Sequence, residues 1–96
     1  MEKIDLIVTR HPGLLTVLAE QGIATADTPV IAHATAGDLR GRHVAGVLPL
    51  ALAAESASVT EVALSLPPEA RGRELTAAEV RQYMTAVRRY RVEVLA

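Results

Sequence analysis

The apolar positions of this 96-residue chain follow two different periods, one typical of buried strands and one typical of helices. Residues 4–9, Ile-Asp-Leu-Ile-Val-Thr, are almost continuously apolar and β-branched, which predicts a strand buried on both faces of a parallel sheet. After the turn at residues 10–13 the spacing becomes helical, with apolar side chains at Leu14, Leu15, Val17, Leu18 and Ala19. Pro12 suits the first position of this helix and Gly22 suits its end.

Four further strands are predicted from apolar runs and from alternation. They cover residues 30–33, 43–48 and 58–66, and a last strand at the sheet edge in which Tyr90, Val92 and Val94 alternate with charged residues. The third of these runs ends at Pro67-Pro68, which cannot continue a strand.

Two further helices are predicted between these strands. One runs from Pro49 to about residue 57. The other begins at Thr76-Ala-Ala-Glu79, which has the form of a capping box. Its apolar stripe is Val80, Tyr83, Met84 and Val87. The predicted order of elements is therefore β-α-β-β-α-β-α-β.

This alternation favours a single Rossmann-like α/β domain over residues 1–96, with a mostly parallel five-stranded sheet and helices on both faces. The nine residues between the second and third strands are too few for a crossover helix but can span one intervening strand. We therefore expect the first strand to lie between the second and the third, with a switch point at its carboxyl end. The turns at residues 9–13 and 46–49 should meet there.

Composition excludes several classes of function. Ten Lys plus Arg against eleven Asp plus Glu give a net charge of −1 and a pI of about 6.3, so we expect no binding to duplex nucleic acid or to an anionic membrane. The absence of Cys excludes disulfides and thiolate metal sites, and it fits a reducing cytoplasm. No apolar run is long enough to span a membrane, and the first residues lack the order of a signal peptide, so we expect a cytoplasmic protein.

The first turn carries the most chemistry. Thr9-Arg10-His11-Pro12-Gly13 joins a buried strand to a helix amino end, where free N–H groups and the helix dipole favour a bound anion. Arg10 adds a guanidinium fork and His11 a group that exchanges protons near neutral pH. The same residues can equally serve only the turn, and Arg-His after a first strand is also similar to the phosphorylated motif of histidine phosphatases.

Other candidate positions lie in later turns. Gly46 allows a ligand to approach the backbone, and Pro49 starts a helix that points at the same place. Arg71 and Arg73 follow the diproline in a basic loop that can close over phosphates or can simply be solvated. His33 and His43 have no nearby carboxylate and no helical spacing, so a metal site is not predicted.

Several motifs in order resemble the small CRISPR-associated accessory proteins of type III systems, of the compact ring-nuclease kind. They run from about residue 7 to residue 92. They are Thr9-Arg10-His11-Pro12-Gly13, Ala32-His33, Gly46-Val47-Leu48-Pro49 with Leu52-Ala53-Ala54, and Leu64-Ser65-Leu66-Pro67 with Arg71-Gly72-Arg73-Glu74-Leu75.

The resemblance implies a CARF-like domain that forms a homodimer and binds cyclic oligoadenylate, with cyclic tetra-adenylate as the expected ring. It implies cleavage to linear products with 2′,3′-cyclic phosphate ends, without metal or cofactor, which switches off antiviral signalling. In that reaction a ribose 2′-OH attacks the neighbouring phosphodiester, and the protein holds the geometry, stabilises charge and manages protons.

On this hypothesis Arg10 is the anion stabiliser and His11 is the general acid or the orienting group. The other ligand-binding residues are expected to be Thr9, Gly13, His33, Gly46, Leu48, Pro49, Arg71 and Arg73. A protein that binds the same ring without cleaving it has the same expected residues, so the sequence leaves that alternative open.

Overall fold

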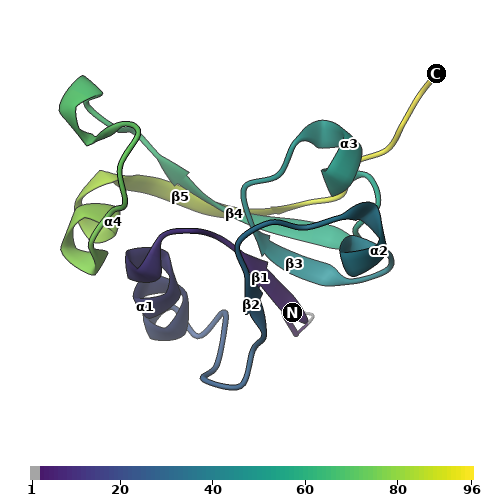
Figure 1. Cartoon of the computed structure of the whole chain (residues 1–96), viewed down its shortest axis with the longest axis horizontal. Helices are drawn as coiled ribbons and strands as arrows, with labels where there is room; N and C mark the ends of the chain where they lie inside the picture. The colour runs from purple at the N-terminus through teal and green to yellow at the C-terminus, as the bar shows by residue number, and fades with distance from the viewer. Residues whose placement is uncertain (1–2) are drawn as a thin grey trace.

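The computed structural model describes residues 3–96, in which five strands form one sheet in the order β2-β1-β3-β4-β5 (Figure 1). The strands are β1 (Leu6–Val8), β2 (Val30–Ile31), β3 (His43–Gly46), β4 (Ser58–Leu64) and β5 (Met84–Tyr90). The helices are α1 (Pro12–Glu20), α2 (Ala36–Leu39), α3 (Leu50–Ala53) and α4 (Ala77–Tyr83), with a 3-10 turn η1 (Pro68–Ala70).

The centre of the sheet is arranged as the sequence predicts. Strand β1 lies between β2 and β3 and pairs with both in parallel. In the pairing with β3, Val8 lies opposite Gly46. The carboxyl ends of β1 and β3 are therefore neighbours, and the turns that follow them leave the same edge of the sheet.

The sheet is mixed, so the prediction of a mostly parallel sheet is wrong. Strand β5 pairs antiparallel with β4, from Val59 opposite Tyr90 to Leu64 opposite Met84. Helix α4 ends at Tyr83, and the Ser65 N–H donates to the Tyr83 carbonyl at 2.9 Å, which brings the start of β5 beside the end of β4. Because the chain stays at the edge where β4 ended, its next strand must run back along β4.

The predicted last helix is too long, because a β-bulge gives the apolar residues of the following strand the spacing of a helix. Leu64 lies opposite Met84 while Ala63 lies opposite Ala86, so Thr85 is an extra residue on β5. This extra residue brings Met84 and Val87 against the same core although they are three positions apart. The last strand consequently covers Met84–Tyr90 rather than the stretch around residues 90–94.

Two shorter helices also depart from expectation. Helix α2 occupies the stretch between β2 and β3, for which the sequence pattern predicts no helix. Thr35 and Asp38 cap it reciprocally, which stabilises a single turn. Helix α3 ends at Ala53 rather than near residue 57, because the chain returns to the sheet and Ala57 N–H donates to the Arg42 carbonyl at 2.8 Å.

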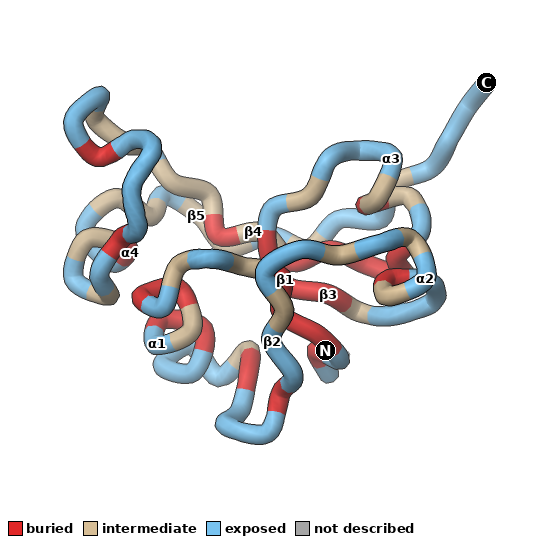
Figure 2. Tube along the Cα trace, viewed as in Figure 1, coloured by how far each residue is buried: buried red, intermediate tan, exposed pale blue. Residues whose placement is uncertain are grey.

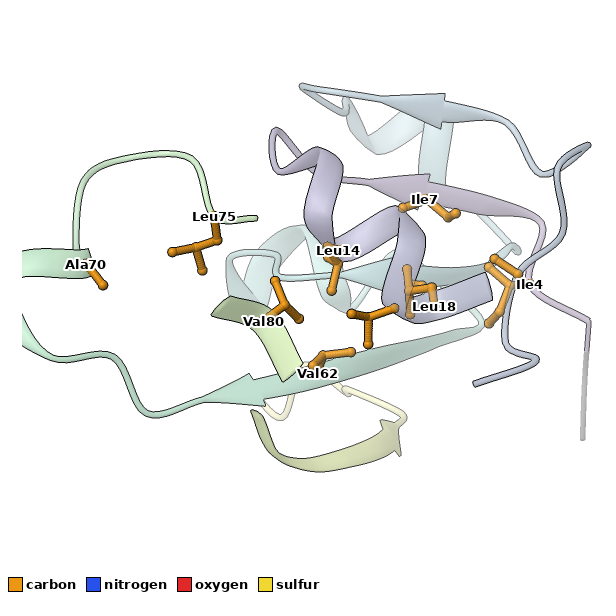
Figure 3. Packing of buried hydrophobic residues seen from close by; sticks show 11 residues of the cluster. Ile4, Ile7, Leu14, Leu18, Val62, Ala70, Leu75 and Val80 are labelled. Carbon is orange, nitrogen blue, oxygen red and sulfur yellow. The ribbon is translucent and has the colours of Figure 1, made fainter. Parts of the chain in front are cut away.

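Side chains of alternate residues in β1 enter two separate cores. Figure 2 shows β1 and most of β3 as buried, and Figure 3 shows the packing of the larger core. Ile7 belongs to the larger core, in which Leu14 and Leu18 of α1, Val62 of β4 and Val80 of α4 pack together. The smaller core lies on the other face of the sheet and consists of Leu6, Val8, Val44 and Leu39, with Leu52 of α3 packed against it. Helices α1 and α4 thus cover one face and α2 and α3 the other.

Within residues 3–96, no helix combines the length and the apolar character needed to cross a membrane. The Rossmann-like, CARF-like assignment stays a prediction.

Candidate functional site

Two cavities at the carboxyl edge of the sheet are both lined by Arg10 and His11. The first has a volume of about 340 Å³ and a mainly apolar lining. Besides Thr9, Arg10 and His11, it is lined by Val8, Leu14, Leu18, Ala32, Gly46, Val47, Val62, Leu64, Leu75 and Val80. The second has a volume of about 330 Å³ and is also lined by Leu66, Ala70, Gly72, Arg73 and Glu74. Arg10 and His11 therefore lie on the boundary between an apolar space and a more polar one.

Gly46 allows the ends of β1 and β3 to come together. Its φ is +143°, and a Cβ at this position would lie 2.2 Å from the Val8 carbonyl oxygen. No other residue type fits there without moving β1. Gly46 lines the first cavity, but the close approach that requires a glycine is made by the protein's own backbone.

His11 is held by a hydrogen bond from its backbone within the turn and by one to its ring from a distant loop. The Thr9 hydroxyl accepts the backbone N–H of His11 at 3.0 Å. The Leu75 N–H donates to Nδ1 of His11 at 3.2 Å, across 64 positions of sequence. Because an N–H can donate only to an unprotonated ring nitrogen, the proton of the uncharged ring is on Nε2.

Arg73 is tied to the loop and to helix α4. Its Nη1 donates to Glu79 Oε1 at 3.0 Å, and its Nη2 is bonded to Oε2 of the same carboxylate. The Arg73 guanidinium and the backbone N–H of Thr76 together lower the pKa of Glu79 to about 2. The same ion pair raises the pKa of Arg73. Arg73 lines the second cavity from this fixed position, whereas the exposed Arg71 lines neither cavity and donates from Nε to the Leu66 carbonyl at 3.4 Å.

Four other predicted ligand-binding residues line neither of these cavities. His33 is exposed beyond the end of β2, and it is the preceding Ala32 that lines the first cavity. Leu48 packs against the smaller core and Pro49 is exposed before α3. Gly13 is buried, and a Cβ there would lie 2.4–2.5 Å from the backbone of residues 75–77. The ligand-binding roles of these four residues stay predictions.

The sequence interpretation missed most of the cavity lining. Val62 and Leu64 alternate along the strand that the sequence predicts over residues 58–66, and both line the first cavity. Leu75 belongs to one of the motifs that carry the resemblance and has no predicted role, yet it lines the cavity and its N–H donates to His11. Alternation along residues 62–66 was the only signal for these positions, because the loop that brings Leu75 to His11 has no periodic pattern.

The opposite edge of the sheet holds a second histidine. His43 Nδ1 lies 2.7 Å from Oγ of Ser58, and both residues start strands of the parallel part of the sheet. In the part of the chain that the structure describes, no three His, Asp or Glu side chains come close enough together to hold a metal ion.

One family model matches the chain over residues 6–93, and it is described as "Putative CRISPR-associated protein (Cas_VVA1548)". No curated protein and no solved structure matches the chain significantly. The matched range contains both cavities and every predicted site residue. The chain belongs to the Cas_VVA1548 family of CRISPR-associated proteins.

Proposed function

We propose that this protein is a ring nuclease that acts in the cytoplasm, binds cyclic oligoadenylate at Arg10 and His11, and cleaves it without metal or cofactor. The observation that carries the proposal is that a cation and a proton-bearing imidazole lie on the boundary of two cavities. A phosphodiester at that boundary has room for a nucleoside on each side. Membership of a CRISPR-associated family and the resemblance of the motifs to ring nucleases support the same ligand.

The first cavity suits a nucleobase of the ligand. Its volume of about 340 Å³ lies in the usual range of small-molecule pockets, roughly 300–1,000 Å³. Its lining is aliphatic, because the chain has only two aromatic residues, Tyr83 and Tyr90, and neither lines the cavity. A base is therefore held by aliphatic contact on its faces, and the phosphate provides the charge that Arg10 attracts.

The proposed reaction is a transesterification that needs no external reactant. The ribose 2′ oxygen forms a bond to the adjacent phosphorus and loses its proton, and the bond from phosphorus to the 5′ oxygen breaks. The 5′ oxygen takes up a proton, so each cut leaves one 2′,3′-cyclic phosphate and one 5′-OH. Arg10 stabilises the doubly charged phosphorane, and Nε2–H of His11 donates to the phosphate or to the leaving oxygen.

The same tautomer argues against the histidine phosphatase alternative. A histidine that attacks a phosphate monoester through Nε2 needs its lone pair there, with the proton on Nδ1. In this structure Nδ1 of His11 accepts from Leu75, so Nε2 carries the proton. This tautomer supports a donating role for His11 rather than a nucleophilic one.

The test is incubation of the purified protein with labelled cyclic tetra-adenylate in excess EDTA, followed by chromatography of the products. Linear fragments with 2′,3′-cyclic phosphate ends are the expected result, and Arg10→Ala and His11→Ala should each abolish most of the product. A linear product that requires added metal, or full cleavage by Arg10→Ala, would overturn the proposed mechanism.

One observation favours a second candidate, a protein that binds the ring without cleaving it. Among residues 3–96, Glu74 is the only carboxylate that lines either of the two cavities, and Nδ1 of His11 is already occupied. The two cavities therefore offer few groups that could remove the proton of the ribose 2′-OH. Intact ring recovered after prolonged incubation, together with tight binding in calorimetry, would establish this alternative.

The proposal includes a homodimer. A ring with repeated symmetry presents equivalent phosphates to two copies of one site related by a two-fold axis. Light scattering with and without cyclic tetra-adenylate tests this, and a stoichiometry of one ring per two chains is the expected result. One ring per single chain would contradict it.

A further inference from the structure

The strongest unassigned feature is the way in which the loop between η1 and α4 holds His11. The Leu75 N–H that donates to His11 Nδ1 belongs to the peptide group between Glu74 and Leu75. At the other end of that peptide group, the Glu74 carbonyl accepts from Nη1 of Arg73 at 3.3 Å. A peptide group is planar and its C=O and N–H point in opposite directions, so fixing the carbonyl also aims the N–H.

The Arg73 guanidinium is itself held in place. It donates to both oxygens of Glu79 and, from Nε, to the Glu69 carbonyl at 3.3 Å. Glu79 is the third residue of α4, and its carboxylate also accepts the Thr76 N–H at 3.1 Å as part of the capping box. Helix α4 therefore orients the guanidinium, which orients the Glu74–Leu75 peptide group.

Burial alone does not determine this orientation. Leu75 is 3% exposed and belongs to the larger core, and the backbone of residues 75–77 packs on Gly13. These contacts fix the position of Leu75 but not the rotation of the peptide group before it. The hydrogen bond from Arg73 fixes that rotation. The positive charge of Arg73 also polarises the peptide group, which makes the Leu75 N–H a stronger donor to His11.

We propose that Arg73 and Glu79 are positioning residues that keep the His11 proton on Nε2, by aiming the Leu75 N–H at Nδ1. This replaces the prediction of Arg73 as part of a mobile cover over the ligand with a role exerted through His11. The inference concerns the tautomer of His11 in the free protein, and only its activity arm depends on the proposed ring nuclease function.

The tautomer is read by NMR on protein labelled with ¹⁵N in histidine, at a pH where the rings are uncharged. The chain has three histidines, and His11→Ala identifies the His11 signals. We expect the wild-type ring to give the Nε2–H pattern and Arg73→Met to give a mixture of the two tautomers. Arg71→Met is the matched control, because Arg71 lies in the same loop but donates to the Leu66 carbonyl instead, and it should leave the pattern unchanged.

Two further variants separate positioning from folding. Arg73→Lys keeps the charge beside Glu79 but cannot supply the planar fork that reaches several acceptors, so it should restore the Nε2–H pattern only in part. Glu79→Gln keeps an oxygen that can accept the Thr76 N–H but loses the ion pair, and it should give an intermediate mixture. An unchanged Nε2–H pattern in a folded Arg73→Met protein, or an Nδ1–H pattern in the wild type, would overturn the proposal.

The activity arm uses cyclic tetra-adenylate. If Arg73 acts through His11, Arg73→Met should lower kcat by about tenfold or more with KM little changed. A raised KM with unchanged kcat would instead make Arg73 a ligand contact and would overturn the positioning role. If the wild-type protein does not cleave the ring at all, the proposed function fails, while the NMR comparison still decides the inference about the tautomer.

Discussion

His11 and His43 lie at opposite edges of the same sheet, and each uses Nδ1 in a hydrogen bond. His11 follows the carboxyl end of β1, and its Nδ1 accepts from a backbone N–H at 3.2 Å. His43 starts β3, and its Nδ1 lies 2.7 Å from the hydroxyl of Ser58. His11 lines two cavities, whereas His43 lines neither of them. The His43 backbone N–H donates to Oδ2 of Asp5 at 3.0 Å, and its carbonyl accepts the Asp5 N–H at 2.7 Å.

The partner decides what each histidine can do. A backbone N–H only donates, so it fixes the proton of His11 on Nε2. A hydroxyl donates or accepts with equal ease, so Ser58 leaves the tautomer of His43 open. At the carboxyl edge, His11 lines two cavities and has a defined tautomer. At the amino edge, the His43 ring satisfies a buried hydroxyl. We therefore expect His11 to take part in the reaction and His43 to stabilise the fold.

The largest expected effect on stability comes from Gly46→Ala. The new Cβ would meet the Val8 carbonyl at 2.2 Å and would require a φ that alanine rarely adopts. Strain and overpacking together should cost roughly 2–6 kcal/mol in the free energy of unfolding, measured with urea. The pairing of β1 with β3 should be lost first at their carboxyl ends, where Val8 lies opposite Gly46, and only later at their amino ends.

Gly37→Ala is the control for this variant. Gly37 lies in helix α2, its φ is ordinary, and a Cβ there would come no closer than 3.8 Å to a neighbour. Alanine should be neutral or stabilising by about 0.5–1 kcal/mol, because it favours the helix. Equal losses in both variants would show that the close approach of β1 and β3 is not what requires Gly46.

The comparison of the two histidines is tested directly by His11→Ala and His43→Ala. His11→Ala should lower the rate of ring cleavage by about 10²–10⁴-fold, since a positioned proton donor is lost. His43→Ala should leave cleavage nearly unchanged but should lower the free energy of unfolding by about 1–3 kcal/mol, because the buried Ser58 hydroxyl loses its partner. Rates by chromatography and urea unfolding of both variants measure this. A His43→Ala protein that folds normally but cannot cleave would reverse the assignment of the two edges.

The centre of the sheet could be predicted from the sequence because local pattern determines it. The β-branched run at residues 4–9 and the nine-residue connection before the third strand leave few topologies, and the predicted neighbours of β1 are confirmed. Arg10 and His11 follow directly from that arrangement, since a turn after a central parallel strand lies at the carboxyl edge. These residues do line the cavities there.

The second half of the chain could not be predicted in the same way. The extra residue at Thr85 gives β5 a spacing that a helix also has, so periodicity alone does not separate them. The contact between His11 and Leu75 depends on where a loop without periodic pattern comes to rest. Sequence shows that Thr76 and Glu79 start a helix, but not that Arg73 binds the same carboxylate.

A smaller effect is expected from pH, through Glu79. Its pKa in the folded protein, lowered to about 2 mainly by Arg73, lies below the ordinary glutamate value of 4.5. A carboxyl group with a depressed folded pKa adds stability that is fully present well above pH 4.5 and is lost as pH falls toward 2. The urea midpoints of wild type and Glu79→Gln should therefore differ at pH 7 and converge at acidic pH. Because the pair is partly exposed, added salt should shrink the difference.

The smallest effect is expected from Arg71→Ala. Arg71 is exposed, lines neither cavity, and donates only a long bond of 3.4 Å to the Leu66 carbonyl, so the free energy of unfolding should change by less than about 0.5 kcal/mol. In calorimetry with cyclic tetra-adenylate, Arg10→Ala should weaken binding far more than Arg71→Ala does. The two cations carry the same charge and lie at the same edge of the sheet, so this difference separates direct contact from general attraction. An equal loss of affinity in both variants, with the same dependence on salt, would support the predicted role of Arg71 in a basic loop that closes over phosphates. The binding site would then extend beyond the two cavities.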